Sequence, residues 1–390
     1  MSAPPVQRAS RALLAGNFAI GCGVMVVPGS LNDLTASLQV SVAVAGQLVS
    51  VAAVTMGVAA PLMAALMGAI DRRRLLTLAL LWYAAGHLLA VVMPGFAALL
   101  PVRAATMLAA AVFTPQAGAA INLLAPPGER GRAITFIFLG WSLASVLGMP
   151  AHSYVAETLG WRWAFALVAV LSIAAAWGVW RALPGGVRPA PMSLRHWGAA
   201  LSNPLFMAMV AVTALSGAGQ FTLFSYFAPY YRQELGASAG SVSFLFLWFG
   251  AFGLLGNLLL SRSIDRWGAA RCVNFTLALM ALSLAAWPLA SSVTVMTLVL
   301  VPWALGCFAS NSAQQARLSG STGAFAPALL ALNTSAIYLG QAVGAGSGGV
   351  LLTAGGYPAL SWAALAWMAL AIAVSVWVGR RMRAAPSGHG

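Results

Sequence analysis

Long apolar runs follow one another from one end of the chain to the other, with only short segments of arginine, proline or glycine between them. A helix needs about 20 apolar residues to cross a bilayer core, and lipid offers the backbone no hydrogen-bond partner outside a helix or a closed barrel. Twelve runs are long enough: residues 12–32, 43–69, 75–94, 97–123, 133–156, 162–183, 204–229, 241–260, 272–290, 293–314, 326–353 and 361–378. The sequence therefore predicts an all-α membrane protein with twelve transmembrane helices.

The charge content supports the same class. Of 390 residues, 61% are hydrophobic and 7% are charged, whereas a soluble domain carries roughly 25% charged residues. The formal net charge of +14 would suggest nucleic acid in a soluble protein, but the basic residues, all arginine, are spread between the apolar runs. We therefore expect no nucleic-acid partner. Cys22, Cys272 and Cys307 each lie within an apolar run, so we expect no disulfide framework, metal site or cofactor.

The arginines predict the orientation, because cytoplasmic loops carry an excess of positive charge. If the N-terminus is inside, 17 of the 20 arginines fall on the cytoplasmic side, Arg162 and Arg232 fall outside, and Arg103 lies within a span. Both termini are then cytoplasmic in a bacterial inner membrane. The first apolar run continues to Leu31, so we interpret it as a retained helix and not as a signal peptide.

The chain also carries signs of a duplication. Ile-Asp-Arg at residues 70–72 returns 194 residues later, and the segments LGWRW (159–163) and GGYPA (355–359) are offset by 196. Pro101 and Pro302 are each expected to start the fourth span of a half. The Pro- and Gly-rich segment between the halves is expected to hold at most a short amphipathic helical turn. We therefore predict two six-helix bundles, residues 1–183 and 204–390, joined by a cytoplasmic linker, residues 184–203, with the site between the halves.

Twelve spans in two halves, each with an acid and an arginine after its second span, resemble the major facilitator superfamily over the whole chain. That family's signature in this loop is Gly-x-x-x-Asp-Arg-x-Gly-Arg. Asp71 and Arg72 match the Asp-Arg core, and Asp265 and Arg266 match Asp-Arg-x-Gly, although neither copy has the leading Gly. The resemblance implies a loop that holds the cytoplasmic side shut, with the acid bonded to free N–H groups at a neighbouring helix start. The alternative is that these charges only set topology.

Two stretches narrow the resemblance to bacterial sugar-efflux and drug:proton antiporter-1 proteins. Residues 13–51 are similar to their first two spans, and residues 129–167 to their fifth span and following loop. Gly148 and Pro150, with Gly140 before them, resemble the antiporter motif of span five. Gly and Pro at these places allow close packing and a bend that aids rocking; the alternative is simple packing.

No carboxylate is predicted near the bilayer midplane. Proton antiport needs a group that gains and loses a proton within the membrane, and relatives often carry a Glu in the middle of span one, where Val24 stands here. All six acids lie in loops or at span ends. We take Asp33 and Arg103 as candidates that pair in one state and separate in another. His87 and His152 are further proton carriers. The alternatives are a helix-end Asp, an Arg that reaches lipid phosphate, and packing histidines.

Uncharged polar and aromatic residues within the spans are the candidates for the substrate route. They are Asn17, Gln116, Trp141, Gln220, Phe224, Asn311, Tyr338 and Gln341. The resemblance favours those on spans one, four, seven and ten, which line the cavity in that family. The alternative for each is a hydrogen bond that merely ties helices together. Such a cavity is neutral, and it suits an amphipathic drug-like molecule or a sugar.

The resulting hypothesis is a monomeric secondary transporter, not an enzyme, that exports a small organic solute by alternating access in exchange for protons. A proton-independent facilitator or exchanger is the first alternative, supported by the missing midplane carboxylate. A membrane sensor without transport, or a membrane enzyme, is the second; the sequence offers no metal-ligand motif, nucleotide loop or extra domain for either. Lipid headgroups are expected to contact the loop arginines.

Overall fold

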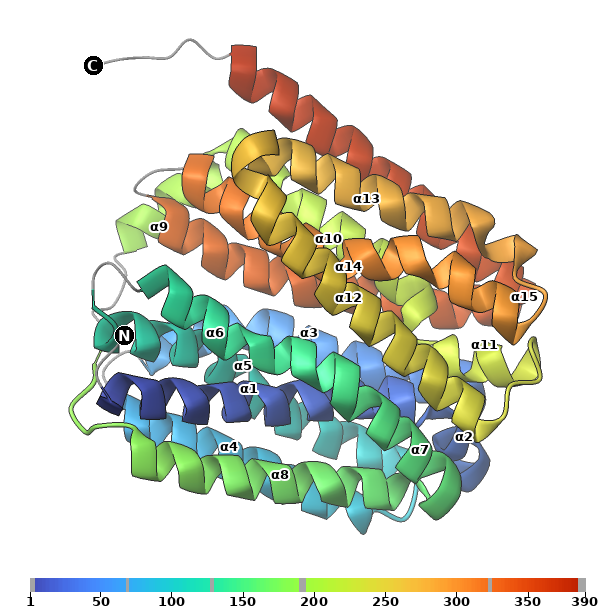
Figure 1. The fold of residues 1–390 in the computed structure, drawn as a ribbon. Helices are drawn as coiled ribbons and strands as arrows, with labels where there is room; N and C mark the ends of the chain where they lie inside the picture. The colour runs from blue at the N-terminus through green and yellow to red at the C-terminus, as the bar shows by residue number, and fades with distance from the viewer. Residues whose placement is uncertain (1–3, 68–69, 127–129, 189–193, 322–324, 385–390) are drawn as a thin grey trace. The chain divides into compact units, whose positions relative to one another are not determined.

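The computed structural model of the chain describes residues 4–67, 70–126, 130–188, 194–321 and 325–384. Within these ranges every regular element is a helix (Figure 1). The chain forms two compact units. The first comprises Met1–Pro191 and Ser225–Gly250, and the second comprises Met192–Phe224 and Ala251–Gly390.

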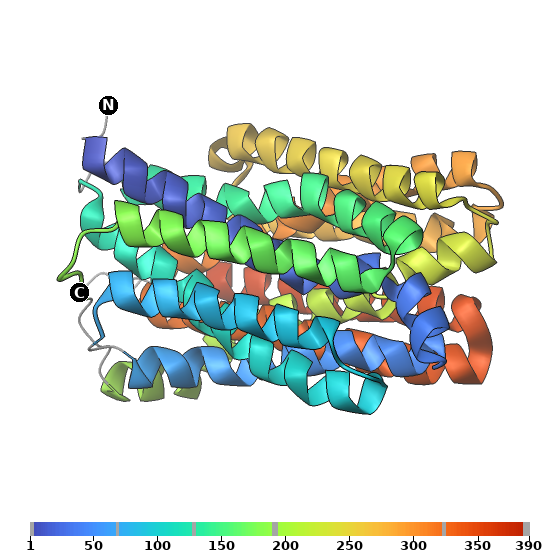
Figure 2. The same ribbon diagram turned by 90° about the horizontal axis from the view of Figure 1, so that it is seen from below.

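The first unit contains most of the N-terminal half. Its helices are α1 (Pro4–Gly29), α2 (Leu31–Leu38), α3 (Val42–Leu66), α4 (Arg72–Val91), α5 (Phe96–Leu124), α6 (Arg130–Leu143), α7 (Met149–Leu159), α8 (Trp161–Ala182), α11 (Phe227–Gln233) and the beginning of α12 (Ala239–Trp267). A π-helix, Ala144–Gly148, joins α6 to α7. Helix α4 packs along α8 and α5, and α1 packs along α6 and α8 (Figure 2).

The second unit contains α9 (Leu194–Ser202), α10 (Pro204–Phe224), the rest of α12, α13 (Ala269–Ala286), α14 (Val293–Ser321) and α15 (Ala326–Ala384). Helix α10 packs along α15, and α13 packs along α14. Glycines bring α10 and α15 close together: a Cβ added at Gly340 would lie 2.3 Å from the Ala214 carbonyl oxygen, and one at Gly344 would lie 2.4 Å from that of Ala218. Such small-residue contacts are typical of membrane helices.

Some of the helices begin where a side chain satisfies their first N–H groups. Ser41 Oγ accepts from the Val44 N–H at the start of α3, and Asn203 Oδ1 accepts from the N–H groups of Leu205 and Phe206 at the start of α10. Since the first four N–H groups of a helix have no partner within it, these caps explain why α3 and α10 begin directly after Ser41 and Asn203.

The outward faces of the helices are apolar. Leu66 is 74% exposed, Val350 is 69% exposed and Trp177 is 65% exposed. In water such surfaces would promote association, whereas a bilayer solvates them. Among the described residues, eleven helices are long and apolar enough to cross a membrane. The last of them breaks at Gly356, where φ is 67° and ψ is −165°, so it supplies two spans and accounts for the predicted twelve.

The two halves repeat at this break. Gly356 and Gly160 are 196 residues apart, and both have a positive φ, 67° and 102°. Glycine adopts this backbone conformation without the strain that a Cβ brings. The turn between the fifth and sixth spans therefore has the same kind of residue in the same kind of conformation in each half, as the segments LGWRW and GGYPA predict.

Three details of the predicted pattern are wrong. Pro101 and Pro302 do not start their helices; each lies inside one, in α5 and α14. The second Ile-Asp-Arg copy does not lie in a loop, because α12 continues to Trp267 and the chain turns at Gly268, with φ 79°. A proline inside a helix removes one backbone hydrogen bond, but neighbouring helices tolerate that loss in a membrane.

The first unit has two ends, set by the alternation of its helices. At the end that carries α2, Arg162 donates from Nε to the Val91 carbonyl oxygen at 3.0 Å and from Nη2 to that of Met93 at 3.2 Å. At the opposite end, the Arg72 N–H donates to the Val187 carbonyl oxygen at 3.0 Å. We refer to these as the α2 end and the linker end.

Candidate functional site

The first unit holds a buried arginine that contacts the backbone of a neighbouring helix. Arg103, on α5, is 2% exposed. Its Nη1 donates to the Gly23 carbonyl oxygen of α1 at 2.8 Å, and its Nη2 donates to that of Val24 at 3.3 Å. A guanidinium fork suits two neighbouring acceptors. Arg103 therefore contacts the backbone of Val24, which stands where the resemblance implies a carboxylate.

Two buried histidines belong to the first unit, and one of them, His87, lies near this arginine. His87, on α4, is within electrostatic range of both Arg103 and His152. His87 Nδ1 lies 2.8 Å from the Tyr83 carbonyl oxygen, and its ring meets that of Tyr83 edge-on at 4.4 Å between centroids. Within the described part of the chain, both ring nitrogens of His152 are buried without a hydrogen-bond partner, whereas the ring of His87 also lies within reach of the Gly23 backbone. Groups of this kind are rare in membrane interiors and mark functional sites.

Tyr83 belongs to the same cluster, although the sequence did not single it out. Its hydroxyl donates to the Ile20 carbonyl oxygen of α1 at 2.9 Å. A Cβ added at Gly23 would lie 2.4 Å from that hydroxyl oxygen, so only glycine lets the two helices approach here. The spacing of four residues between Tyr83 and His87 places them on one helix face, and this was the only available sign.

Asp33 does not pair with Arg103 in this structure. Its Oδ2 accepts from the Trp161 N–H at 2.6 Å, at the first residue of α8. A carboxylate is favourable at a helix start, because free N–H groups and the positive end of the helix dipole meet there. Asp33 is therefore a cap that ties α2 to α8, and its pairing with Arg103 remains a prediction for another conformation.

The antiporter-motif residues lie around the π-helix. A Cβ added at Gly140 would lie 2.4 Å from the Leu14 carbonyl oxygen, and one at Gly148 would lie 2.4 Å from Cys22 Sγ. Both glycines therefore hold α1 against the α6–α7 segment. Pro150 is the second residue of α7, directly after the π-helix. A single π-helical turn in a long helix frequently marks a functional site, which agrees with a bend at this point.

The cavity candidates of the first unit differ in their contacts. Asn17 is fully buried and donates from Nδ2 to the Ile137 carbonyl oxygen at 3.0 Å, while its Oδ1 accepts from Thr114 Oγ1 at 3.1 Å. It therefore ties α1 to α5 and α6. Gln116 is buried on α5. Trp141 is partly buried on α6, and its Nε1 has no hydrogen-bond partner among the described residues.

The second unit holds the other cavity candidates. Tyr338 and Gln341 are buried on α15, Phe224 is buried at the end of α10, and Gln220 is partly buried one turn before it. Asn311, on α14, accepts from Gln315 Nε2 at 3.4 Å. That these residues share one cavity with those of the first unit remains a prediction.

Polar contacts of the second unit add residues to this set. Thr213 Oγ1, on α10, donates to Asn333 Oδ1 at 2.5 Å, and Gln314 Nε2 donates to the Met209 carbonyl oxygen at 2.5 Å. Met209 and Thr213 are one turn apart on the same helix. In the described part of the chain Asn333 Nδ2 and Gln314 Oε1 are buried without a partner. These side chains thus present one free donor and one free acceptor.

Asp71 and Arg72, the first copy of the gating loop, make other contacts than the resemblance implies. Asp71 caps its own helix, since its Oδ1 accepts from the Arg74 N–H at 3.2 Å, and its Oδ2 accepts from the Gly186 N–H of the linker. Arg72 Nη1 donates to the Ile70 carbonyl oxygen at 2.7 Å. The acid thus reaches the linker and not a neighbouring helix start. In the second copy Arg266 is exposed at the end of α12, and the side chain of Asp265 lies outside the described residues.

Replacing Asp71 with alanine is expected to free the linker near Gly186 and speed hydrogen exchange there at least about threefold, because two capping contacts are lost. Partial burial raises the pKa of the Asp71 carboxyl, but the N–H groups of Arg74, Gly186 and Arg73 and the Arg74 charge bring it below its usual value. A lowered pKa means that the contact is complete at neutral pH and is lost only as the pH falls through that lowered value. Exchange measured from pH 5 to 8 and corrected for intrinsic rates is expected to show the same protection of the wild type throughout, and equal protection in the alanine variant would contradict the capping role of Asp71.

Together these features define a multi-pass helical membrane protein built from two related halves, with polar groups buried between its helices, which is the architecture of a secondary transporter. The chain belongs to the major facilitator superfamily, since the sequence profile described as Major Facilitator Superfamily matches residues 13–324 and 210–389.

Several relatives carry transport or resistance names. The chain is 29% identical over 345 residues to the inner membrane transport protein YdhP of Escherichia coli (strain K12), covering 88% of each chain. It is 27% identical over 365 residues to the MFS-type transporter YbcL of Bacillus subtilis (strain 168), covering 92% of this chain and 93% of that one. It is 33% identical over 252 residues to a chloramphenicol resistance protein of Streptomyces lividans, covering 64% of each.

A solved structure has the same fold. The crystal structure of a D-xylose-proton symporter superposes with a TM-score of 0.76, covers 96% of this chain and 97% of that chain, and is 17% identical in sequence. The prediction of a twelve-helix major facilitator fold is therefore confirmed, and the chain is a membrane transporter of this family.

Proposed function

We propose that the protein exports a small, uncharged organic solute by alternating access, in exchange for protons. The observation that carries the substrate class is the neutral chemistry of the polar interior. The candidate cavity residues are amides and aromatics, and Asp33, Asp71, Glu157 and Glu234, the acids whose side chains the structure describes, stand at helix ends or in turns. A strongly charged solute would meet no counter-charge among these candidate cavity residues. The relative named for chloramphenicol resistance supports a drug-like solute, and a sugar fits the same chemistry.

Proton exchange is assigned to the cluster of Arg103, His87 and His152. An imidazole in water changes charge near neutral pH, and the two ring nitrogens of His152, which have no hydrogen-bond partner among the described residues, give a proton a place to bind. Arg103 supplies a fixed positive charge beside His87. Because like charges repel strongly in a low-dielectric interior, the bound proton leaves readily when the site opens to the other side.

The second candidate function is proton-independent exchange or facilitated diffusion. The observation that favours it is the absence of a midplane carboxylate from the sequence, with Val24 where relatives carry an acid. Alternating access and the neutral solute are the same in this version, but the imidazoles then only pack. A membrane sensor or a membrane enzyme is disfavoured, because the relatives are named as transport and resistance proteins.

Dissipating the pH gradient is expected to reduce solute accumulation in everted membrane vesicles at least about tenfold, because the gradient then supplies no driving force. A panel of fluorescent drug-like solutes and labelled sugars identifies the solute. Vesicles without the protein correct for leak, and valinomycin with potassium separates the pH gradient from the membrane potential. Accumulation that survives the loss of the gradient favours the second candidate.

Both termini are assigned to the cytoplasm, with the linker end inside and the α2 end outside. The arginine bias supports this orientation, because the loops at the α2 end hold few arginines. We assign the protein to the inner membrane, in agreement with the relative named as an inner membrane transport protein, and we expect it to act as a monomer. Anionic lipid headgroups are the expected partners of the arginines at the linker end.

A further inference from the structure

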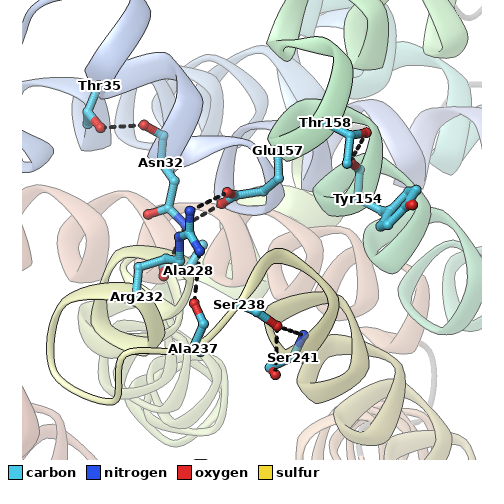
Figure 3. A network of polar contacts seen from close by, with 10 residues as sticks. All are labelled: Asn32, Thr35, Tyr154, Glu157, Thr158, Ala228, Arg232, Ala237, Ser238 and Ser241. Carbon is cyan, nitrogen blue, oxygen red and sulfur yellow. Dashed lines mark hydrogen bonds and ion pairs between the residues drawn. The ribbon is translucent and has the colours of Figure 1, made fainter.

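A polar network at the α2 end joins three helices of the first unit (Figure 3). Asn32 on α2 donates from Nδ2 to Glu157 Oε1 on α7 at 2.5 Å and to the Ala228 carbonyl oxygen on α11 at 3.2 Å. Arg232 on α11 forms an ion pair with Glu157, with 3.4 Å between Nη2 and Oε2. Arg232 Nη1 also donates to the Ala237 carbonyl oxygen at 3.0 Å, which fixes the turn between α11 and α12.

Burial makes Glu157 depend on these partners. Its side chain is 6% exposed, whereas that of Arg232 is 43% exposed. A carboxylate withdrawn from water is costly unless it is paired and hydrogen-bonded, and here each carboxylate oxygen has one partner. Loss of the negative charge would remove the ion pair with Arg232 and weaken the contact with Asn32 together. Water already reaches Arg232, so α11 loses little when it separates from α7.

The importance of this network follows from how α11 is connected along the chain. Residues 225–250 group with the first unit by contact, but they continue α10 and lead into the rest of α12, both of which belong to the second unit. By the repeat they belong to the first two spans of the second half. Two further close approaches join these residues to the rest of the first unit. A Cβ added at Gly46 would lie 2.4 Å from Tyr226 Oη, and one at Gly250 would lie 2.7 Å from Val146 Cα.

We propose that Glu157, Asn32 and Arg232 are the gate residues of the α2 end. Resting on the alternating access of the proposed function, this inference states that the network holds residues 225–250 against α2 and α7 in the conformation closed at that end. When the network breaks, these residues separate from α2 and α7 with α10 and α12 and open the α2 end. The ion pair thereby sets the ratio of closed to open molecules, since a contact that exists in one state only shifts the equilibrium toward that state.

The test measures the distance across this end by double electron–electron resonance. Spin labels are attached at cysteines introduced at Ala36 on α2 and Gly240 on α12, which are both exposed. The native cysteines Cys22, Cys272 and Cys307 are buried. In Glu157→Gln and in Arg232→Glu the ratio of the long-distance to the short-distance population is expected to rise about tenfold. The double variant Glu157→Arg with Arg232→Glu restores the original ratio.

The matched control is Glu234→Gln, an exposed acid two residues from Arg232 for which the structure describes no side-chain partner. It is expected to leave the distance distribution unchanged. The inference is overturned if Glu157→Gln shifts the distribution no more than this control, or if the charge swap fails to restore it. Asn32→Ala, which removes no charge, gives a smaller shift and replaces Arg232→Glu if that variant does not fold. Because the distances are measured without solute, they test the gate even if the vesicle experiments contradict solute export.

Discussion

Replacing Arg103 with methionine is expected to reduce solute export in everted vesicles at least about tenfold, which corresponds to about 1.4 kcal/mol or more in the rate-limiting barrier. Methionine is similar in length and apolar, so the space stays filled. The two contacts to the Gly23 and Val24 carbonyl oxygens and the positive charge beside His87 are lost. An ionisable group in a membrane interior is costly to keep and is retained where it has a function. Uptake rates with and without a pH gradient, normalised to the amount of folded protein, measure this effect.

Two further variants separate charge from packing. Arg103→Lys keeps the charge but lacks the fork that reaches two carbonyl oxygens, so its export rate is expected to lie between those of the wild type and Arg103→Met. Arg317→Met is the matched control. Arg317 is also a buried arginine, but it binds Ser375 in the second unit. Its loss is expected to lower thermal stability and to leave the gradient dependence unchanged. Equal export defects in Arg103→Met and Arg317→Met would contradict a specific role for Arg103.

The spans and their turns were predictable because the bilayer leaves the chain few options. Hydrocarbon requires every backbone group to be satisfied within a helix, so the apolar runs give the spans directly. The segments that contain Gly160 and Gly356 were recognised as a repeat at a fixed offset. Both glycines adopt a positive φ in the structure. Helix ends were less certain. Pro101 and Pro302 lie inside helices because buried neighbours tolerate the lost backbone hydrogen bond.

The partners of the charged residues were not predictable from the sequence. Asp33 caps α8, whose first residue is Trp161, across 128 positions of the chain, and Asp71 reaches the linker at Gly186 across 115. Which free N–H group an acid finds depends on how the helices pack, and no local pattern encodes that choice. The sequence showed that Arg103 is unusual, because it stands alone in an apolar run. It did not show that backbone carbonyl oxygens would be its acceptors.

Glu157 and Arg232 were missed for the same reason. Each stands at a span end, where a charge is ordinary, and they are 75 residues apart in different halves of the repeat. Only the grouping of residues 225–250 with the first unit brings them together. The scarcity of acids was the one sign that Glu157 could have a specific role, because in a chain with six carboxylates each one is a candidate for more than a loop charge.

Replacing Gly140 with valine is expected to destabilise the first unit by about 3 kcal/mol or more, at the upper end of what overpacking costs in cores. A Cβ here would lie 2.4 Å from the Leu14 carbonyl oxygen and 2.7 Å from the Phe18 backbone nitrogen. Backbone atoms cannot move aside as a flexible side chain does, so α1 and α6 must separate. The Asn17 contact to Ile137, one turn away, is then lengthened from its 3.0 Å. The midpoint of thermal unfolding in detergent, with the yield of monodisperse protein, measures the loss.

The matched control is Gly178→Val on α8, where an added Cβ would meet no atom within 4 Å. Valine there exchanges one weak helix former for a somewhat better one and adds apolar surface toward lipid, so the unfolding midpoint is expected to stay the same or to rise slightly. If both variants behave alike, the close approach of α1 and α6 does not limit stability. If Gly140→Ala keeps the fold but slows export, while Gly178→Ala keeps both the fold and the export rate, the same contact also serves the bend at the π-helix. The packing of α1 against α6 and the movement between these two helices then both depend on Gly140, because the two helices must move against each other at the same close contact that holds them together.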